Sequence, residues 1–189
     1  MMPKPDPLSR TRDPPSSTCC CPPPLARRHL LGLGLAAIPA AFFPSLGAAA
    51  DYGSYEATLL TCIDPRFIKA AGGYMAGRHW AGKYSQFSFA GAAIGAVAPK
   101  FATWHQTYWD NLQVTVGLHH VKTVVALNHR DCGAAKLAYG DAAVGTPEAE
   151  AETHRKALAD FRREVTRRHP NLQVVTGLIA RDGKVEMVG

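Results

Sequence analysis

The chain has 189 residues, which is room for one domain of ordinary size. Its composition, 47% hydrophobic and 19% charged, excludes an intrinsically disordered protein. The formal net charge is +6, but without residues 1–50 it falls to +3, with 16 basic and 13 acidic residues. So small an excess gives no reason to expect a nucleic-acid partner.

Residues 1–50 differ sharply from the rest, because they hold ten of the fourteen prolines. They contain the pair Arg27-Arg28, a modestly apolar stretch over residues 30–46 and the small residues Ala48-Ala49-Ala50. This order of basic, apolar and small residues is typical of an export signal with a cleavage site. Glycine and proline interrupt the apolar stretch, so we expect no stable membrane span after cleavage.

The arginine pair indicates the export route. Arg27-Arg28 followed by His29-Leu30-Leu31 resembles a twin-arginine translocation signal, which carries proteins that are already folded and loaded with cofactor. An ordinary secretory signal is the alternative. We therefore expect residues 1–50 to be a cleaved twin-arginine signal. Residues 51–189 would then be the mature domain, periplasmic or otherwise exported.

The mature part opens with alternating strand and helix signals. Residues 57–61 (ATLLT) form a short apolar run with a β-branched end, which predicts a buried strand that ends before Cys62. Residues 67–77 predict a short helix that stops at one of its glycines. Residues 87–90 (FSFA) predict a second strand.

A longer helix is predicted over residues 101–117, where large apolar side chains recur every four residues on one stripe. The stripe consists of Trp104, Tyr108, Leu112 and Val116. We expect it to form part of the core or of a dimer contact. Residues 121–127 (VKTVVAL) then predict a central strand that is covered on both faces, because nearly all of them are apolar.

The C-terminal third predicts two helices and two strands. The helices cover residues 134–140 and 146–169, the second with Thr146 as N-cap and a proline at its first position. The strands cover residues 172–180 and 184–188 and are joined by an Asp-Gly turn. Alternating strands and helices predict an α/β domain with a mostly parallel central sheet flanked by helices, and an antiparallel edge from the last two strands.

Three potential metal ligands lie at strand ends that such a sheet brings together. Cys62 follows the first strand, and His129 and Cys132 follow the central one. Ligands of open parallel sheets gather outside the carboxyl ends of the strands. Two thiolates and an imidazole suit Zn²⁺, and three protein ligands leave a fourth position for water. The alternative is a disulfide between Cys62 and Cys132, as in many exported proteins.

Both segments resemble the paired motif of β-class carbonic anhydrases. Cys62-Ile63-Asp64-Pro65-Arg66 matches Cys-x-Asp-x-Arg, and His129-Arg130-Asp131-Cys132-Gly133 matches His-x-x-Cys-Gly. The resemblance covers residues 57–189 and implies a β-carbonic-anhydrase-like fold with one Zn²⁺ per chain, held by Cys62, His129 and Cys132. It also implies hydration of CO₂ to bicarbonate by a metal-bound hydroxide, in a homodimer or higher homo-oligomer.

The resemblance makes Asp64 and Arg66 the catalytic pair, and their chemistry supports this role. A carboxylate two residues from a zinc thiolate either takes the fourth metal position or accepts a hydrogen bond from bound water. The guanidinium of Arg66 matches a carboxylate and can hold Asp64 away from the metal. Asp64 is also placed to cap the helix that follows, with Pro65 at its first position.

Two departures from the family pattern keep other functions open. Only a short segment separates Asp51 from Cys62, where family members carry a longer helical arm, so we expect a less interwoven dimer. Ser88-Phe89-Ala90-Gly91 stands where many members have Arg-Asn-Ala-Gly. An altered pocket would suit a hydrolase of COS or CS₂ on the same zinc site, and a non-catalytic zinc-binding protein is a further alternative. The candidate proton shuttles are His79, His105, His119 and His120.

Overall fold

Five strands form one sheet in the part of the chain that the computed structural model describes, residues 53–189. The strands are β1 (Ala57–Thr61), β2 (Tyr84–Ser88), β3 (Thr123–His129), β4 (Gln173–Ile179) and β5 (Val185–Met187). Their order is β2-β1-β3-β4-β5, and β5 alone runs antiparallel to its neighbour. The predicted α/β architecture with an antiparallel edge is therefore confirmed.

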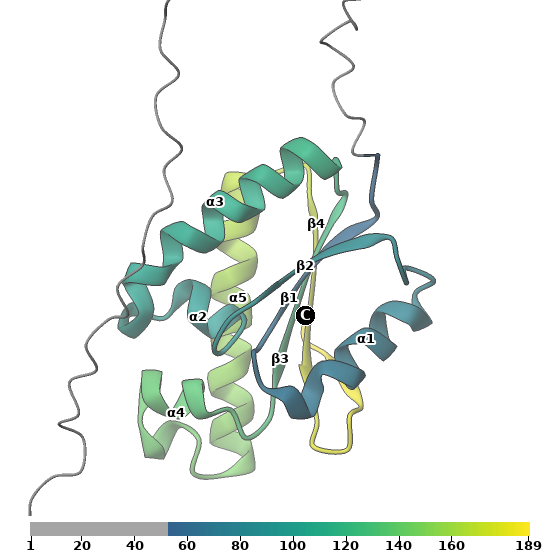
Figure 1. Cartoon of the computed structure of the whole chain (residues 1–189). Coiled ribbons are helices and arrows are strands. Elements are labelled where there is room, and N and C mark those ends of the chain that lie inside the picture. Colours follow the sequence, from purple (N-terminus) through teal and green to yellow (C-terminus); the bar gives the residue numbers. More distant parts are fainter. Residues whose placement is uncertain (1–52) are drawn as a thin grey trace, which may run out of the picture. The chain divides into compact units, whose positions relative to one another are not determined.

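Helices cover both faces of this sheet (Figure 1), with α1 on one face and α2, α3 and α5 on the other. The helices are α1 (Ile68–Gly77), α2 (Ala93–Val97), α3 (Ala102–His119), α4 (Gly133–Tyr139) and α5 (Pro147–Arg168). Short 3₁₀ turns cover Pro65–Phe67, Pro99–Phe101 and Asp141–Ala143. Among residues 53–189, no helix has both the length and the apolar character that crossing a bilayer requires.

The neighbouring strands β1 and β3 are buried along their whole length, which explains their apolar sequences. Successive side chains of a strand point to opposite faces. Leu60 and Val124 accordingly pack against the α2, α3 and α5 side, whereas Leu59 and Val125 pack against α1. The sheet thus separates two halves of the core, and both halves hold β1 and β3 in place.

The larger half of the core is built on α3 and α5. Tyr108 and Leu112 of the predicted stripe are buried there, while Trp104 at its start is 38% exposed. Phe161 of α5 is fully buried, with its ring centroid 5.6 Å from that of Tyr108 and 5.7 Å from that of Trp109. This aromatic contact fixes α3 and α5 against the same face of the sheet.

Replacing Phe161 with alanine is expected to lower the free energy of unfolding by about 3–5 kcal/mol, because it leaves a cavity between two aromatic rings. Urea unfolding followed by circular dichroism measures the loss. Leu137→Ala is the control, since the Leu137 side chain is 70% exposed and its removal should change stability by less than about 0.5 kcal/mol. Equal losses in the two variants would contradict this assignment of the core.

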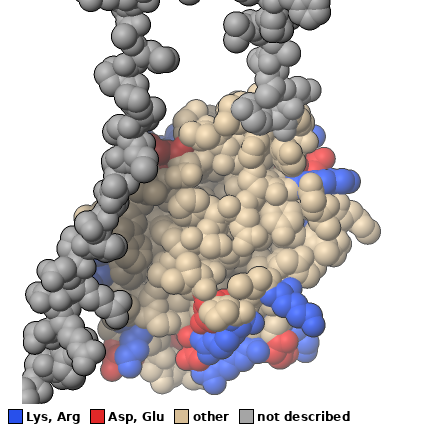
Figure 2. All heavy atoms as spheres, in the orientation of Figure 1, with Lys and Arg blue, Asp and Glu red and all other residues tan. Residues whose placement is uncertain are grey.

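Charged side chains are unevenly spread over the surface. Figure 2 shows a wide uncharged area on the visible face and a gathering of charges at its lower end, where β3 runs into α4 in Figure 1. The predicted export signal, residues 1–50, lies outside the described residues. The start of the mature domain at residue 51 therefore stays a prediction.

Candidate metal centre

Two parallel neighbouring strands, β1 and β3, bring Cys62 and His129 to one edge of the sheet. Thr61 lies opposite Leu127 in their register, so the two strands end close together. Cys62 directly follows β1. His129 is the last residue of β3 rather than a loop residue, because the strand continues along β4 until His129 pairs with Ile179.

A tight turn after β3 brings Cys132 back to the other two side chains. Asp131 in this turn has a φ of +60°, in the left-handed region that few residues other than glycine adopt. The N–H of Arg130 donates to the carbonyl of Ile179 at 2.9 Å, which ties the turn to β4. As a result, the Sγ atoms of Cys62 and Cys132 and an imidazole nitrogen of His129 lie within 4.8 Å of one another.

The buried imidazole of His129 has one nitrogen available for a metal. Its Nδ1 lies 2.9 Å from the carbonyl oxygen of Arg130, and since a carbonyl only accepts, Nδ1 carries the proton. Its Nε2 is buried and has no hydrogen-bond partner among the described residues. Cys62 and Cys132 are free thiols and form no disulfide. An orphaned nitrogen beside two free thiols fits a zinc ion, which prefers nitrogen and sulfur ligands.

The electrostatics of the two cysteines also suit a cation. The neighbouring Cys132 side chain lowers the pKa of Cys62 to about 4, and the nearby His129 and the N–H of Gly91 act in the same direction. The same contact with Cys62, together with burial, raises the pKa of Cys132. One sulfur of the pair is therefore anionic at neutral pH, and thiolate is the form of cysteine that binds metals.

The loop between β2 and α2 forms the wall behind Cys62. Gly91 has a φ of +83°, and its N–H lies 3.2 Å from the Cys62 sulfur. The positive φ favours glycine at this position, and a Cβ there would also lie only 3.1 Å from the Cβ of Ala134. Ala93 continues this wall, because its N–H donates to the side chain of Asn128 at 3.0 Å. The metal centre is thus backed by closely packed small residues.

Asp64 and Arg66 form an ion pair beside the three candidate ligands. Asp64 caps the turn Pro65–Phe67 by accepting from the Arg66 N–H at 3.0 Å, as the sequence predicts. Nε and Nη2 of Arg66 also donate to the Asp64 carboxylate, at 3.0 and 2.7 Å. This contact lowers the pKa of Asp64 to about 2 and raises that of Arg66. Oδ2 of Asp64 lies 4.0 Å from Nε2 of His129, so the carboxylate borders the metal position.

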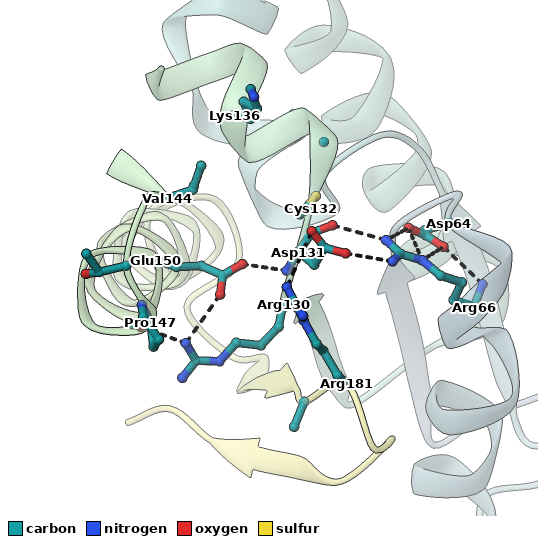
Figure 3. A pocket seen from close by; sticks show the side chains of 14 residues that line it. Asp64, Arg66, Arg130, Asp131, Cys132, Lys136, Val144, Pro147, Glu150 and Arg181 are labelled. Atoms are coloured by element: carbon teal, nitrogen blue, oxygen red, sulfur yellow. Dashed lines mark hydrogen bonds and ion pairs between the residues drawn. The ribbon is translucent and has the colours of Figure 1, made fainter. Parts of the chain in front are cut away.

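Glu150 of α5 supports the turn between the candidate ligands His129 and Cys132, and sequence patterns did not identify it. Its side chain, 12% exposed, accepts from the N–H of Asp131 at 2.5 Å and from Nη1 of Arg130 at 3.4 Å. Nη1 of Arg130 also donates to the carbonyl of Pro147 at 2.7 Å. Figure 3 shows these groups joining the first turn of α5 to the loop that carries Cys132.

A pocket of about 820 Å³ opens beside this loop. Asp64 and Cys132 lie on its wall, next to charged side chains from several elements (Figure 3). The charged residues are Arg66, Arg130, Asp131, Lys136, Glu150 and Arg181. Solvent and small molecules therefore have a polar approach to the Asp64 side of the metal centre.

His154 is a second fully buried histidine close to the site. Its Nδ1 accepts from the Asn128 side chain at 3.1 Å, and among the described residues its Nε2 has no partner. Burial, with smaller effects from His129 and Arg130, lowers its pKa to about 4. His154 is therefore neutral at neutral pH and supports Asn128, which in turn holds the wall behind Cys62.

The stability of the fold should depend on pH through His154. The unfolded chain protonates this group near pH 6.5 and the folded protein only near pH 4, so its contribution is complete above pH 6.5 and is lost as the pH falls toward 4. The stability advantage of the wild type over His154→Gln should shrink by about 3 kcal/mol over that range. Urea unfolding of both proteins at each pH measures this, and a constant advantage would contradict it.

The four histidines named as candidate proton shuttles lie apart from the wall of the pocket. Nε2 of His105 is 3.0 Å from the carbonyl of Ala98, and Nδ1 of His119 is 2.6 Å from the Ser85 hydroxyl. His79 and His120 have positive φ angles, at the ends of their helices. The structure therefore gives none of the four a contact with the pocket.

No protein-family model matches the sequence. Solved β-carbonic anhydrase structures are similar in fold alone. A tetrameric enzyme of Sordaria macrospora is 13% identical with a TM-score of 0.48, covering 72% of this chain and 82% of that chain. An enzyme of Aspergillus fumigatus is 15% identical with a TM-score of 0.49, covering 71% and 76%, and a Coccomyxa enzyme with bound acetazolamide is 14% identical with a TM-score of 0.48, covering 72% of each.

Sequence relatives are found in Rickettsia. An uncharacterized protein of Rickettsia bellii is 30% identical over 130 residues, which are 69% of this chain and 79% of the relative. An uncharacterized protein of Rickettsia conorii is 31% identical over 130 residues, 69% of this chain and 70% of the relative. At this identity and coverage, the chain belongs to the same protein family as these two rickettsial proteins.

Proposed function

We propose that this protein is a zinc enzyme that hydrates CO₂ to bicarbonate, a lyase of the carbonic anhydrase type. The observation that carries the proposal is the convergence of two motifs, in which the ligand atoms of Cys62, His129 and Cys132 lie within 4.8 Å of one another. Asp64 and Arg66 stand beside them as a hydrogen-bonded pair. The same residues in the same order carry the resemblance to β-class carbonic anhydrases.

Cys62, His129 and Cys132 would hold one Zn²⁺ per chain. A zinc ion with three protein ligands keeps a fourth position for water and lowers the pKa of that water to about 7, which supplies a nucleophile at neutral pH. Nδ1 of His129 donates to a backbone carbonyl, and this bond fixes the orientation of the ring. The N–H of Gly91 does the same for the sulfur of Cys62.

Asp64 would orient the attacking water by accepting a hydrogen bond from it. The carboxylate is ionised at neutral pH, because Arg66 lowers its pKa to about 2, and it is therefore an acceptor only. Arg66 holds it by two side-chain nitrogens. Behind the ligands, Cys62 packs against a buried apolar cluster that includes Ile94 and Phe101. This cluster excludes water from that side and leaves the approach from the pocket.

We propose that the enzyme acts as a homodimer or a larger homo-oligomer. Figure 2 shows a wide uncharged area on one face, which is the kind of surface that a second copy would cover. Light scattering coupled to gel filtration should give a mass of at least two chains. A monodisperse monomer with full activity would contradict this part of the proposal.

We also propose that residues 1–50 direct export to the periplasm by the twin-arginine route. The pair Arg27-Arg28 and the small residues Ala48-Ala49-Ala50 support it. A tagged chain should appear in the periplasmic fraction and lack residues 1–50 by mass spectrometry. The variant with lysine at both arginines should stay inside the cell, and unchanged export of that variant would favour an ordinary secretory signal.

Metal analysis combined with stopped-flow CO₂ hydration tests the proposed function. We expect about one zinc per chain and a hydration rate that rises as the pH passes 7. Sulfide release from COS or CS₂ with negligible CO₂ hydration would instead select a hydrolase on the same site. If the protein binds zinc but turns over none of these substrates, the result would favour a non-catalytic zinc-binding protein.

A further inference from the structure

Arg66 contacts the metal site from two sides. Its Nε and Nη2 bind the Asp64 carboxylate, while its Nη1 donates to Oδ2 of Asp131 at 2.7 Å. Its Nη2 also lies 3.1 Å from the backbone carbonyl of Asp131. One guanidinium therefore joins the Cys62 motif to the turn between His129 and Cys132, as Figure 3 shows.

Asp131 is itself fixed by its surroundings. Its positive φ directs the turn, and its N–H is held by the buried carboxylate of Glu150. Its own carboxylate, 48% exposed, faces Arg66 and, at 3.7 Å, Arg181. The backbone of Asp131 is thus anchored to α5, and its side chain is left free to anchor Arg66.

Asp64 has two positions open to it. In the structure Arg66 holds it, and its Oδ2 lies 4.0 Å from Nε2 of His129. A carboxylate oxygen is also a good zinc ligand, so a small movement would place it on the metal and close the fourth position. What holds Arg66 in place therefore decides which position Asp64 takes.

We propose that Asp131 is a positioning residue that acts through Arg66 to hold Asp64 off the metal, an inference that rests on the proposed metal site. The side chain of Arg66 is 53% exposed and long, so one carboxylate alone leaves it several arrangements. The second carboxylate, on a turn fixed by Glu150, restricts it to one. Exposed ion pairs add little to stability, so the effect of Asp131 is expected at the site rather than on the fold.

Asp131→Gly removes the carboxylate, and glycine tolerates the positive φ at this position. Asp131→Asn is the second variant, because asparagine also accepts this conformation and keeps the shape of the side chain. The control is Asp182→Asn, which removes an exposed carboxylate that pairs with Lys184, outside the metal centre. All three should fold and take up one Co²⁺ per chain in place of zinc.

The readout is azide binding to the cobalt-substituted proteins, followed by visible absorption, because azide needs an open metal position. We expect Asp131→Gly to weaken azide binding by about tenfold or more, Asp131→Asn to weaken it less, and Asp182→Asn to leave it unchanged. In an Asp64→Ala background, Asp131→Gly should change nothing further, because the carboxylate that would close the site is gone.

Equal azide affinity in the wild type and Asp131→Gly would overturn the proposal, and so would an undiminished effect of Asp131→Gly in the Asp64→Ala background. A wild-type protein that binds no cobalt would overturn both this proposal and the metal site. A wild type that binds cobalt but hydrates no CO₂ would refute the proposed activity, while the azide comparison would still decide the role of Asp131.

Discussion

Replacing His129 with glutamine is expected to remove the bound metal and to lower the rate of CO₂ hydration by about a thousandfold or more. His129 supplies the nitrogen of the proposed ligand set, and its Nε2 is the buried atom without a partner among the described residues. Without the metal, water of ordinary pKa is the remaining nucleophile. Metal content by mass spectrometry and stopped-flow hydration, measured on the same sample, check the prediction.

His154→Gln is the matched control for this change. His154 is equally buried, and its Nε2 is orphaned in the same way, but it lies outside the cluster of Cys62, His129 and Cys132. We expect this variant to keep one metal per chain while losing stability, since it disturbs the contact with Asn128. Loss of metal in both variants would mean that burial of histidine, rather than ligation, explains the result.

Asp64→Asn should keep the metal, unlike His129→Gln, but should lower kcat/KM by about a hundredfold. The carboxylate is expected to accept a hydrogen bond from the attacking water, and an amide is a poorer and misoriented acceptor. None of the three ligands is altered, so zinc content should remain at one per chain. Stopped-flow hydration and metal analysis measure the two quantities together.

The control for Asp64→Asn is the exposed change Asp182→Asn, outside the three candidate ligands and their ion pair, which should leave kcat/KM within about twofold of the wild type. If Asp64→Asn retains full activity, Asp64 has no part in the reaction. If it loses the metal, Asp64 is a ligand at rest, and Arg66 does not hold it away as we infer.

Much of the fold could be predicted, because hydrophobic patterns indicate the buried strands and the longer helices. The strand Ala57–Thr61 was predicted with its observed bounds, since a continuous apolar run indicates a strand buried on both faces. The predicted bounds of the second strand were wrong: residues 87–90 were predicted, whereas the strand covers Tyr84–Ser88. Three of its five residues are polar and none is fully buried at the sheet edge, so the apolar pattern misplaced it. Helix α2 has five residues, too few to show a period.

The candidate site could be predicted only in part. Local spacing and strand ends are visible in the sequence, so the convergence of Cys62, His129 and Cys132 could be expected. Glu150 and His154 could not, because their contacts depend on how α5 packs against the turn after β3. The contact of Asp131 with Arg66 could not be predicted either. Its bond to Arg66 spans 65 positions of sequence and requires the positive φ of the turn.

X-ray absorption at the zinc edge of the purified mature protein tests the central claim most directly, because it reports the atoms around the metal. Convergence of the two motifs on one ion predicts two sulfur atoms at about 2.3 Å and one nitrogen at about 2.0 Å, with a light atom as the fourth neighbour. A shell of nitrogen and oxygen alone, or a disulfide between Cys62 and Cys132 in the same sample, would contradict it.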